Sequence, residues 1–354
     1  MKTTQYSLGN RSIGSEQPPL FIAELSGNHG HCLADTREMI RQAAAAGADA
    51  VKLQTYTPDS LTLPFRTPLF LQTSGLWKGR YLYDMYTEGS IPWEWHQPLA
   101  EEARSHGLIF LSTPFDDKAV DLLESLDVPI YKIASHEVVH LPLLERVGKT
   151  QKPVLLSTGM ANEDEIQLAL DTLYNAGTPW VVLLKCISAY PAKQEGFNLL
   201  SIQALQNRFG TPVGLSDHTL TPETTLGAIA LGACVIEKHF VLSRASGVLD
   251  SGFSLEPQEL KATITLAKSL WKSLGKPVIG PSEQEAVEQR FRRSIFVSEP
   301  IQSGETLTAK NLRIVRPANG LAPKHWDAVL GKQASEPLEP GTPLQWAHIN
   351  ELVN

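Results

Sequence analysis

The stretch LFIAELSGNHGHCLADTREMIRQAAAAGADAVKLQTY, from Leu20 to Tyr56, has the pattern of a strand, a helix and a second strand. Its two ends, Leu20–Ser26 and Ala50–Tyr56, are short and nearly continuous apolar runs, which is typical of strands buried on both faces of a parallel sheet. Between them, Asp35 with a glutamate three residues later predicts a helix start, and Gly47 predicts the helix end. The stretch therefore predicts one strand–helix–strand unit.

Six further apolar runs of this kind follow along the chain, and helix-like segments separate them. These runs are Leu108–Pro114, Pro129–Ala134, Pro153–Thr158, Trp180–Ile187, Pro212–Ser216 and Cys234–Phe240. Eight strand–helix units within about 260 residues predict an α/β fold of the TIM (β/α)8 barrel type. An open doubly wound sheet is the less favoured alternative, because no GxGxxG motif follows the first run.

The connection between the second and third runs is unusually long. This insert spans about residues 57–92 and is rich in aromatic side chains, namely Phe65, Phe70, Trp77, Tyr81, Tyr83 and Tyr86. A long loop that joins a strand to a helix is more often functional than idle. Alternatively, these aromatic side chains form a small hydrophobic cluster of their own beside the main core.

The pattern changes near residue 280. A Gly-Pro-Ser sequence at residues 280–282 precedes a charged, helix-like segment, and beyond it the sequence predicts only short strands and turns. We therefore predict three parts: a TIM-barrel catalytic domain over residues 1–280, a linker helix over 281–290 and a small β-rich domain over 291–354.

Charge and composition disfavour several classes of protein. The 31 basic and 38 acidic residues give a net charge of −7 and form no basic block, which argues against nucleic acid as a partner. No run approaches the roughly 18 apolar residues of a membrane span, and the first ten residues lack an apolar signal-peptide core. The three cysteines are too few for a disulfide framework or a CxxC metal site. We therefore expect a cytoplasmic protein with no membrane partner, most simply an enzyme.

Polar residues gather at the C-terminal ends of the predicted strands, where a TIM barrel carries its active site. Charged groups seldom occupy a barrel mouth unless they are paired, bound to metal or functional, and here all eight runs end in polar residues. The candidates are Glu24, Lys52, Gln54, Thr113, Lys132, Ser135, Glu137, Ser157, Lys185, Ser188, Tyr190, Ser216 and Asp217. We therefore predict a functional site at this end of the barrel.

Two histidines, His218 and His239, end adjacent predicted strands. Neighbouring strands lie about 4.8 Å apart, so both imidazoles can reach one ion. A single such histidine is more often a hydrogen-bonded core residue, but two imidazoles beside oxygen donors suit a divalent Mn, Fe, Co, Zn or Mg ion. Asp217 and Glu237 precede the two histidines closely and are candidates for orienting them.

The lysines Lys52, Lys132 and Lys185 share the predicted mouth with several serine hydroxyls. Cations beside hydroxyls indicate an anionic ligand, most simply one with a phosphate and a carboxylate. Ion pairs between these lysines and neighbouring glutamates are the alternative. A Schiff-base lysine is a rival interpretation, and the histidine pair argues against it because that chemistry needs no metal.

Segments that carry these residues resemble the sialic acid synthase family in order and spacing. They are ELSGNHG (24–30), DAVKLQTYTPDSLTL (49–63), STPFD (112–116), YKIASHE (131–137), LSTGMA (156–161), LLKCISAYPA (183–192), GLSDHTL (214–220) and EKHF (237–240). FRRSIFV, SGETLT and RPANGL resemble the family's C-terminal SAF, or antifreeze-like, domain. GLWKGRYLYDMY (75–86) and IPWEWH (91–96) resemble the pseudaminic acid branch of the family, whereas Val248-Leu249 replace its usual Gly-Pro.

The resemblance implies a transferase that condenses phosphoenolpyruvate with the open-chain aldehyde of an acetamido sugar and releases phosphate. In the pseudaminic acid branch that sugar is 2,4-diacetamido-2,4,6-trideoxy-L-altrose, and the sialic and legionaminic acid branches use other acetamido sugars. The resemblance also implies a divalent metal on His218 and His239, with Mn²⁺ favoured over Mg²⁺ or Co²⁺. It further implies a domain-swapped homodimer in which the SAF domain of one chain caps the barrel of the other.

Roles follow for the individual residues. The expected catalytic residues are Glu24, Lys52, Lys132, Asp217 and Arg316, the last reaching the sugar from the neighbouring chain's SAF domain. The expected substrate-binding residues are Gln54, Thr113, Ser135, Glu137, Ser157, Lys185, Ser188, Tyr190, Ser216 and Asp250. The competing class is a carbohydrate-binding protein built on a barrel that has lost its activity.

Overall fold

The computed structural model describes residues 6–9, 11–14 and 16–350. The chain divides into two compact units, residues 1–275 and 276–354. The domain bounds that the sequence suggests, 1–280, 281–290 and 291–354, stay predictions, and their outer ends lie outside the described residues. None of the described helices is long and apolar enough to cross a membrane.

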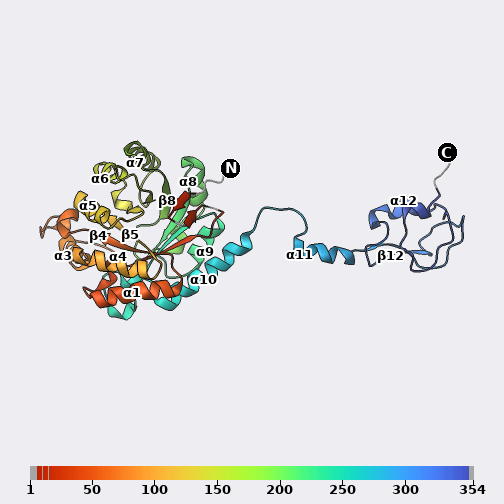
Figure 1. The fold of residues 1–354 in the computed structure, drawn as a ribbon, viewed down its shortest axis with the longest axis horizontal. Coiled ribbons are helices and arrows are strands. Elements are labelled where there is room, and N and C mark those ends of the chain that lie inside the picture. Colours follow the sequence, from red (N-terminus) through yellow and green to blue (C-terminus); the bar gives the residue numbers. More distant parts are fainter. Residues whose placement is uncertain (1–5, 10, 15, 351–354) are drawn as a thin grey trace. The chain divides into compact units, whose positions relative to one another are not determined.

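The first unit is built on eight parallel strands (Figure 1). They are β3 (Leu20–Glu24), β4 (Ala50–Thr55), β5 (Ile109–Pro114), β6 (Tyr131–Ile133), β7 (Val154–Ser157), β8 (Val181–Cys186), β9 (Val213–Asp217) and β10 (Val235–His239). Strands that are consecutive in the chain lie side by side, and β10 pairs with β3. This cyclic order confirms the predicted TIM-type barrel.

Helices cover the outside of these strands (Figure 1). They are α1 (Leu33–Ala46), α4 (His96–Ser105), α5 (Asp117–Ser125), α6 (Leu141–Gly148), α7 (Glu163–Ala176), α8 (Ser201–Phe209), α9 (Glu223–Ala230) and α10 (Pro257–Leu274). The first helix ends at Gly47 as expected, with φ at 91°. It begins at Leu33 rather than near Asp35, because Cys32 already holds the extended conformation of a cap residue.

An N-terminal hairpin, β1 (Tyr6–Leu8) and β2 (Arg11–Ile13), adds an element that the sequence patterns did not predict. Leu8 and Ile13 pack with Leu20, at the start of β3, in the cluster that fills the barrel interior. The hairpin therefore lies at the end of the barrel opposite the carboxyl ends of the strands. Its two strands of three residues are too short for a periodic signal.

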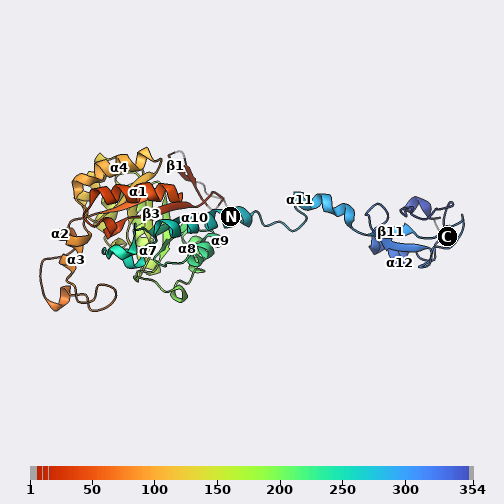
Figure 2. The ribbon, with the colours of Figure 1, turned by 90° about the horizontal axis from the view of Figure 1, so that it is seen from below.

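The aromatic insert lies between β4 and α4. It contains α2 (Pro58–Leu61), α3 (Leu82–Gly89) and the 3₁₀ turns Pro68–Phe70 and Trp93–Trp95. A bridge between Leu71 and Tyr81 closes a loop in its middle. Figure 2 shows this loop extending from the body of the barrel beside α2 and α3.

The second unit is small and rich in turns. It contains α11 (Glu283–Ala286), the 3₁₀ turn Val287–Phe291, the antiparallel strands β11 (Ser294–Val297) and β12 (Leu312–Val315), the 3₁₀ turn Pro323–His325, α12 (Trp326–Val329) and the 3₁₀ turn Trp346–His348. Its own buried cluster includes Ile295, Leu307 and Leu344. The unit therefore has a hydrophobic core separate from that of the barrel.

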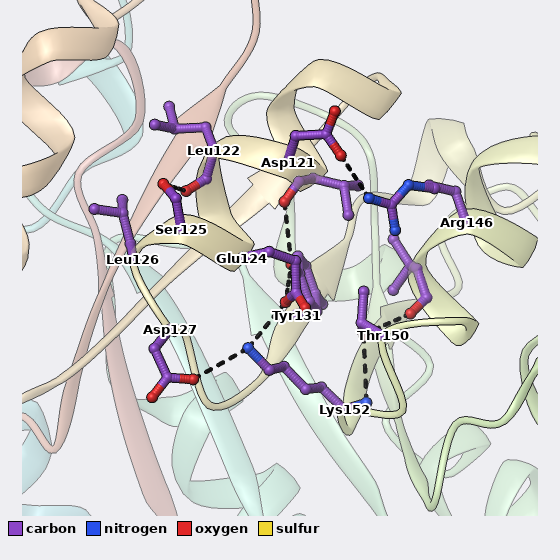
Figure 3. A network of polar contacts seen from close by, with 12 residues as sticks. Asp121, Leu122, Glu124, Ser125, Leu126, Asp127, Tyr131, Arg146, Thr150 and Lys152 are labelled. Carbon is purple, nitrogen blue, oxygen red and sulfur yellow. Dashed lines mark hydrogen bonds and ion pairs between the residues drawn. The ribbon is translucent and has the colours of Figure 1, made fainter.

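A polar network anchors β6 from outside the barrel (Figure 3). The Tyr131 hydroxyl donates to Glu124 of α5 at 2.8 Å, and Lys152 pairs with Glu124 at 2.9 Å and with Asp127 at 3.4 Å. Because side chains alternate along a strand, Tyr131 faces outward and Lys132 faces inward. The network thus fixes the strand that carries Lys132.

Gly214 in β9 generates a prediction about folding. A Cβ at this position would lie 2.4 Å from the Val235 carbonyl oxygen and 2.7 Å from a Leu184 methyl, so Gly214→Ala forces neighbouring strands apart. We expect a loss of about 1–3 kcal/mol in unfolding free energy, measured by urea denaturation. Gly196→Ala, whose Cβ meets only Ile187 at 3.7 Å, is the control. Equal stability of the two variants would contradict the prediction.

Candidate active site

Lys52 stands at the centre of the barrel mouth. Its ammonium lies 2.8 Å from Glu24 Oε2 and 3.7 Å from Glu237 Oε1, and it donates to Thr113 Oγ1 at 3.2 Å. Its side chain is only 2% exposed. A buried ammonium needs such partners, because burial without them costs several kcal/mol. Strands β3, β4, β5 and β10 each supply one member of this group.

Lys132 of β6 extends the charged group to the far side of the mouth. Its ammonium lies 3.7 Å from Glu237 Oε1, and Ser216 donates to the same oxygen at 3.1 Å. Gln54 donates to Glu24 Oε1 at 2.9 Å. One buried cluster therefore contains two lysines and two glutamates, and its members come from six strands.

The surroundings of the two glutamates shift their pKa values in opposite directions. Burial raises the pKa of Glu24. Burial acts on Glu237 in the same direction, but the nearby charges of Lys132 and Lys52 outweigh it and lower the pKa of that carboxyl. Two carboxyl groups whose environments separate their pKa values are typical of sites that transfer protons. Glu24 is the one that holds a proton more readily.

Serine hydroxyls without protein partners lie beside the lysines. Ser157 Oγ and Ser188 Oγ are buried, and neither has a hydrogen-bond partner among the described residues. The Gly159 amide donates to Ser135 Oγ at 3.1 Å, and a Cβ at Gly159 would lie 2.5 Å from Ser188 Oγ. Buried hydroxyls normally find a partner, so these groups are candidates for binding a polar ligand.

Glu137 also contributes to the mouth. Its Oε2 is buried and has no hydrogen-bond partner among the residues that the structure describes. Burial raises the pKa of this carboxyl to about 7, against the opposing charge of Lys132. The side chain can therefore carry or release a proton near neutral pH.

The two histidines face each other at the ends of β9 and β10. Their ring centroids lie 5.1 Å apart. His218 Nδ1 donates to the Ile187 carbonyl oxygen at 2.8 Å, and His239 Nδ1 lies 3.1 Å from Ser26 Oγ. Burial lowers the pKa of His218 to about 4 and lowers that of His239 well below its usual value. Both rings are therefore neutral at pH 7, with Nε2 of His218 left as an acceptor.

The two histidines supply part of a metal-binding site. Neutral imidazole is the form that binds metal, and a backbone carbonyl on Nδ1 is a common way to orient such a ring. Among residues 6–9, 11–14 and 16–350, no group of three or more His, Cys, Asp or Glu side chains is arranged to hold an ion. The protein would therefore supply two ligands.

Tyr190 and Asp250 complete the surroundings of the histidines. The Tyr190 ring lies 4.5 Å from that of His218, centroid to centroid. Asp250 Oδ2 accepts from the Gly27 amide at 3.0 Å, next to Ser26, and burial raises the pKa of this carboxyl. Tyr190 thus contacts His218, and Asp250 lies beside the segment of Ser26, which contacts His239.

Asp217 does not join the buried cluster. Its carboxylate pairs with Lys238 at 3.1 Å and accepts from the hydroxyls of Thr219 and Thr225 at 2.8 and 2.9 Å. It alternates with Ser216, so it faces the helices rather than the barrel interior. Its partners tie β9 to β10 and α9, and the catalytic role expected for Asp217 stays a prediction.

Lys185, like Asp217, lies one residue away from a position that faces the barrel interior. Along β8, Leu184 belongs to the interior cluster and Leu183 to the cluster beneath the helices. Cys186 therefore continues the interior set, whereas Lys185 continues the outer one. The Cys186 thiol is hydrogen-bonded with Ser135 and Ser216, so the structure brings it, and not Lys185, into the mouth.

Three residues of the site were missed or underrated by sequence reasoning. Cys186 was not selected, Ser26 was noted at the end of its strand without a role, and Glu237 was considered as an orienting residue or as an ion-pair partner of the lysines. Strict alternation from Val182 through Leu184 would have identified Cys186. Arg316 is exposed and belongs to the second unit, so its predicted role stays a prediction.

Substitutions in the Asp217–Lys238 ion pair test whether Asp217 stabilises the fold. Both side chains are at most 1% exposed, so Asp217→Ala leaves a buried ammonium unpaired and is expected to cost about 3–5 kcal/mol of unfolding free energy. Replacing both partners, Asp217→Leu with Lys238→Met, should recover most of that loss. Urea denaturation measures each variant.

The control is Glu163→Ala, which removes an exposed ion pair with Arg208 and should cost less than about 1 kcal/mol. An Asp217→Ala protein as stable as the control would contradict the structural role.

Comparison with known proteins places this geometry in a family. The chain matches the NeuB family over residues 39–278 and the SAF domain over residues 292–350. It is 43% identical to pseudaminic acid synthase of Helicobacter pylori, over 93% of this chain and 97% of that protein. It is 34% identical to N,N'-diacetyllegionaminic acid synthase of Legionella pneumophila, over 96% and 97%.

A solved structure supports the same assignment. The N-acetylneuraminic acid synthetase of Leptospira borgpetersenii is 31% identical, with a TM-score of 0.73, and the match covers 81% of this chain and 95% of that one. The family match extends over more than half of the chain and includes the strands from β4 to β10. The protein therefore belongs to the NeuB family and has a C-terminal SAF domain.

Proposed function

We propose that this protein is a pseudaminic acid synthase. It condenses phosphoenolpyruvate with 2,4-diacetamido-2,4,6-trideoxy-L-altrose and releases phosphate. The observation that carries the proposal is the identity of 43% with the Helicobacter pylori pseudaminic acid synthase over nearly the whole chain. Synthesis of legionaminic or N-acetylneuraminic acid is the alternative, and the lower identity to the legionaminic acid enzyme, 34%, disfavours it.

Phosphoenolpyruvate is bound by the cations and hydroxyls of the mouth. Lys52 and Lys132 attract its phosphate and carboxylate. The hydroxyls of Ser135 and Ser157 donate to the same oxygens, Ser216 joins them when its hydroxyl turns away from Glu237, and Thr113 supports Lys52. The unpartnered Ser157 Oγ supports this assignment, because a bound anion would satisfy it. These charges are positioned before the substrate arrives, which favours transition-state stabilisation.

His218 and His239 hold a divalent metal ion in this proposal, with Mn²⁺ preferred over Mg²⁺ or Co²⁺. Such an ion polarises the aldehyde oxygen of the sugar as a Lewis acid. Support comes from the neutral, facing imidazoles and from the hydrogen bond that orients His218. Ser26 orients His239 in the same way.

The reaction forms one carbon–carbon bond and, at carbon 2 of phosphoenolpyruvate, replaces the carbon–oxygen bond to phosphate with one to the oxygen of water. Carbon 3 of phosphoenolpyruvate attacks the aldehyde carbon, water adds at carbon 2, and the carbon 2–oxygen bond breaks to release phosphate. Burial raises the pKa of Glu24, which suits this carboxyl to give a proton to a substrate oxygen. Burial acts to raise the pKa of Glu237 as well, but the charges of Lys132 and Lys52 lower it, so Glu237 is suited to face the two lysines as a carboxylate.

Other mouth residues position the sugar. Tyr190 and Asp250 lie near the histidines, Ser188 lies beside Gly159, and Gln54 orients Glu24. Glu137, with a pKa of about 7, is available for a sugar hydroxyl or amide. Lys185 stays a weaker candidate for substrate binding, because it belongs to the outer register of β8.

We also propose a domain-swapped homodimer in which the SAF domain of each chain covers the barrel mouth of its partner. Exposed apolar side chains on loops after β6, β7, β8 and β9 support this, since such side chains favour a covered surface. They are Val139, Met160, Leu200 and Leu220. In this arrangement Arg316 reaches the acetamido group of the sugar. The three free cysteines agree with a cytoplasmic location.

Phosphate release tests the function. The protein is incubated with phosphoenolpyruvate and, separately, the altrose-derived sugar, its legionaminic acid counterpart and N-acetylmannosamine. We expect phosphate chiefly with the altrose-derived sugar, loss of activity after chelation and recovery with Mn²⁺. His239→Ala should lower kcat more than about 100-fold, whereas the surface variant His106→Ala should not. Full activity after complete metal removal would contradict the metal's role, and a preference for another sugar would contradict the substrate.

Complementation tests the dimer. Arg316→Ala and Lys52→Ala chains are each expected to be inactive. When they are co-expressed, half of the dimers are mixed, and each mixed dimer has one barrel with Lys52 capped by a domain with Arg316. About a quarter of wild-type activity should return, and light scattering should give the mass of a dimer. No recovery in a dimer of the expected mass would contradict the swap.

A further inference from the structure

The tip of the aromatic insert contacts the loop that follows β10. Trp77 Nε1 donates to the Leu249 carbonyl oxygen at 3.1 Å. The methyl groups of Leu76 lie 3.5 and 3.7 Å from the position that a Cβ on Gly252 would take. Two segments separated by more than 170 residues in the chain are thus in contact at this point. The insert is therefore held against the wall of the active site.

Aromatic rings continue from this contact to the histidine pair. The Trp77 ring centroid lies 5.5 Å from that of Tyr190 and 6.1 Å from that of Phe253. Tyr190 lies 4.5 Å from His218, and Phe253 lies 4.7 Å from His239. The three aromatic rings form one wall, which we call the Trp77 wall, and Trp77 is the member furthest from the histidines.

Leu249 supports this wall from behind. Cβ atoms placed on Gly27 and Gly89 would lie 3.2 and 2.8 Å from the same Leu249 methyl, so this side chain fills the space beside the first barrel loop and the end of α3. Its carbonyl oxygen is the partner of Trp77. The wall is therefore packed in place before a ligand binds, which reduces the entropy cost of binding.

The chemistry of the wall is apolar on the side of Trp77. The indole has a single hydrogen-bond donor, Nε1, and Leu249 already occupies it. A sugar hydroxyl placed against this ring would lose water and gain no partner, whereas a methyl group would gain contact area. The wall therefore favours a substrate whose remote end carries methyl groups.

We propose that Trp77 is a specificity-determining residue that contacts a methyl group at the end of the sugar remote from the aldehyde. This rests on the proposed function, in which the histidine pair lies at the aldehyde end. Trp77 lies beyond Tyr190 and Phe253, so it meets carbons 4 to 6. Two methyl groups share this chemistry, the one at carbon 6 and the one of the acetamido group at carbon 4.

The test compares Trp77→Ala, Trp77→Phe and Phe70→Ala with the unmodified protein. Phe70 is the matched control, because its ring pairs with Phe65 within the insert at 6.1 Å. Phosphate release gives kcat/KM for two pairs of sugars. One pair differs only by methyl or hydroxymethyl at carbon 5, and the other only by acetamido or hydroxyl at carbon 4.

Trp77→Ala should lower kcat/KM roughly 10- to 100-fold for the sugar that carries the recognised methyl group, and less than about threefold for the partner that lacks it. Trp77→Phe should retain most of the discrimination, and Phe70→Ala should change nothing. The KM for phosphoenolpyruvate should stay constant in all variants. The pair whose ratio changes identifies which methyl group is contacted.

The role of Trp77 would be overturned if Trp77→Ala lowered kcat/KM equally for both members of both pairs, or did not lower it at all, while the KM for phosphoenolpyruvate stayed unchanged. Either result would leave the proposed function intact. Unmodified protein that releases no phosphate with any of the sugars would overturn both. A Trp77→Ala protein that misfolds is recognised by its thermal transition. Trp77→Gln, which keeps a longer side chain at this position but removes the apolar ring, then takes its place, with the same selective loss expected and the same outcomes overturning the role.

Discussion

The burial of four charged side chains inside one barrel mouth is the constraint on which the active site depends. Lys52 and Lys132 face Glu24 and Glu237, and all four are at most 5% exposed. Charges at this depth are tolerated only when they are paired. Lys52 pairs with both Glu24 and Glu237, and Lys132 pairs with Glu237. A protein with a net charge of −7 thereby places two lysine ammonium groups at the site proposed for an anionic substrate.

The outer layer of the barrel holds this cluster in position. Asp217 and Lys238 join β9 to β10 beneath the helices, and Tyr131 joins β6 to α5. Gly214 lets β9 approach the backbone of β10 more closely than any side chain would allow. Each of these residues lies in the same strand as an interior polar group, because the two faces of a strand alternate. The same short strands therefore carry outward residues that hold the barrel together and inward residues that form the polar cluster.

Reaction and specificity are built from different parts of the chain. The charged cluster and the histidines occupy strand ends, where the barrel geometry fixes them. The Trp77 wall combines the insert with loops after β8 and β10, which are free to differ without altering the strands. The proposed reaction therefore depends on the strand ends, and the proposed choice of sugar depends on the insert.

The sequence by itself determined the eight strands, the polar residues at their ends, the histidine pair and a second β-rich part, because apolar runs and turn residues are local signals. It did not determine the N-terminal hairpin, whose strands are too short to show a period. It also did not show that Asp217 and Lys185 face the helices and that Cys186 faces the barrel interior, since the inward or outward direction of a residue depends on the register of the closed barrel. The contact of Trp77 with Leu249 joins positions far apart in the chain, so only the tertiary structure decided that the insert forms part of the active-site wall.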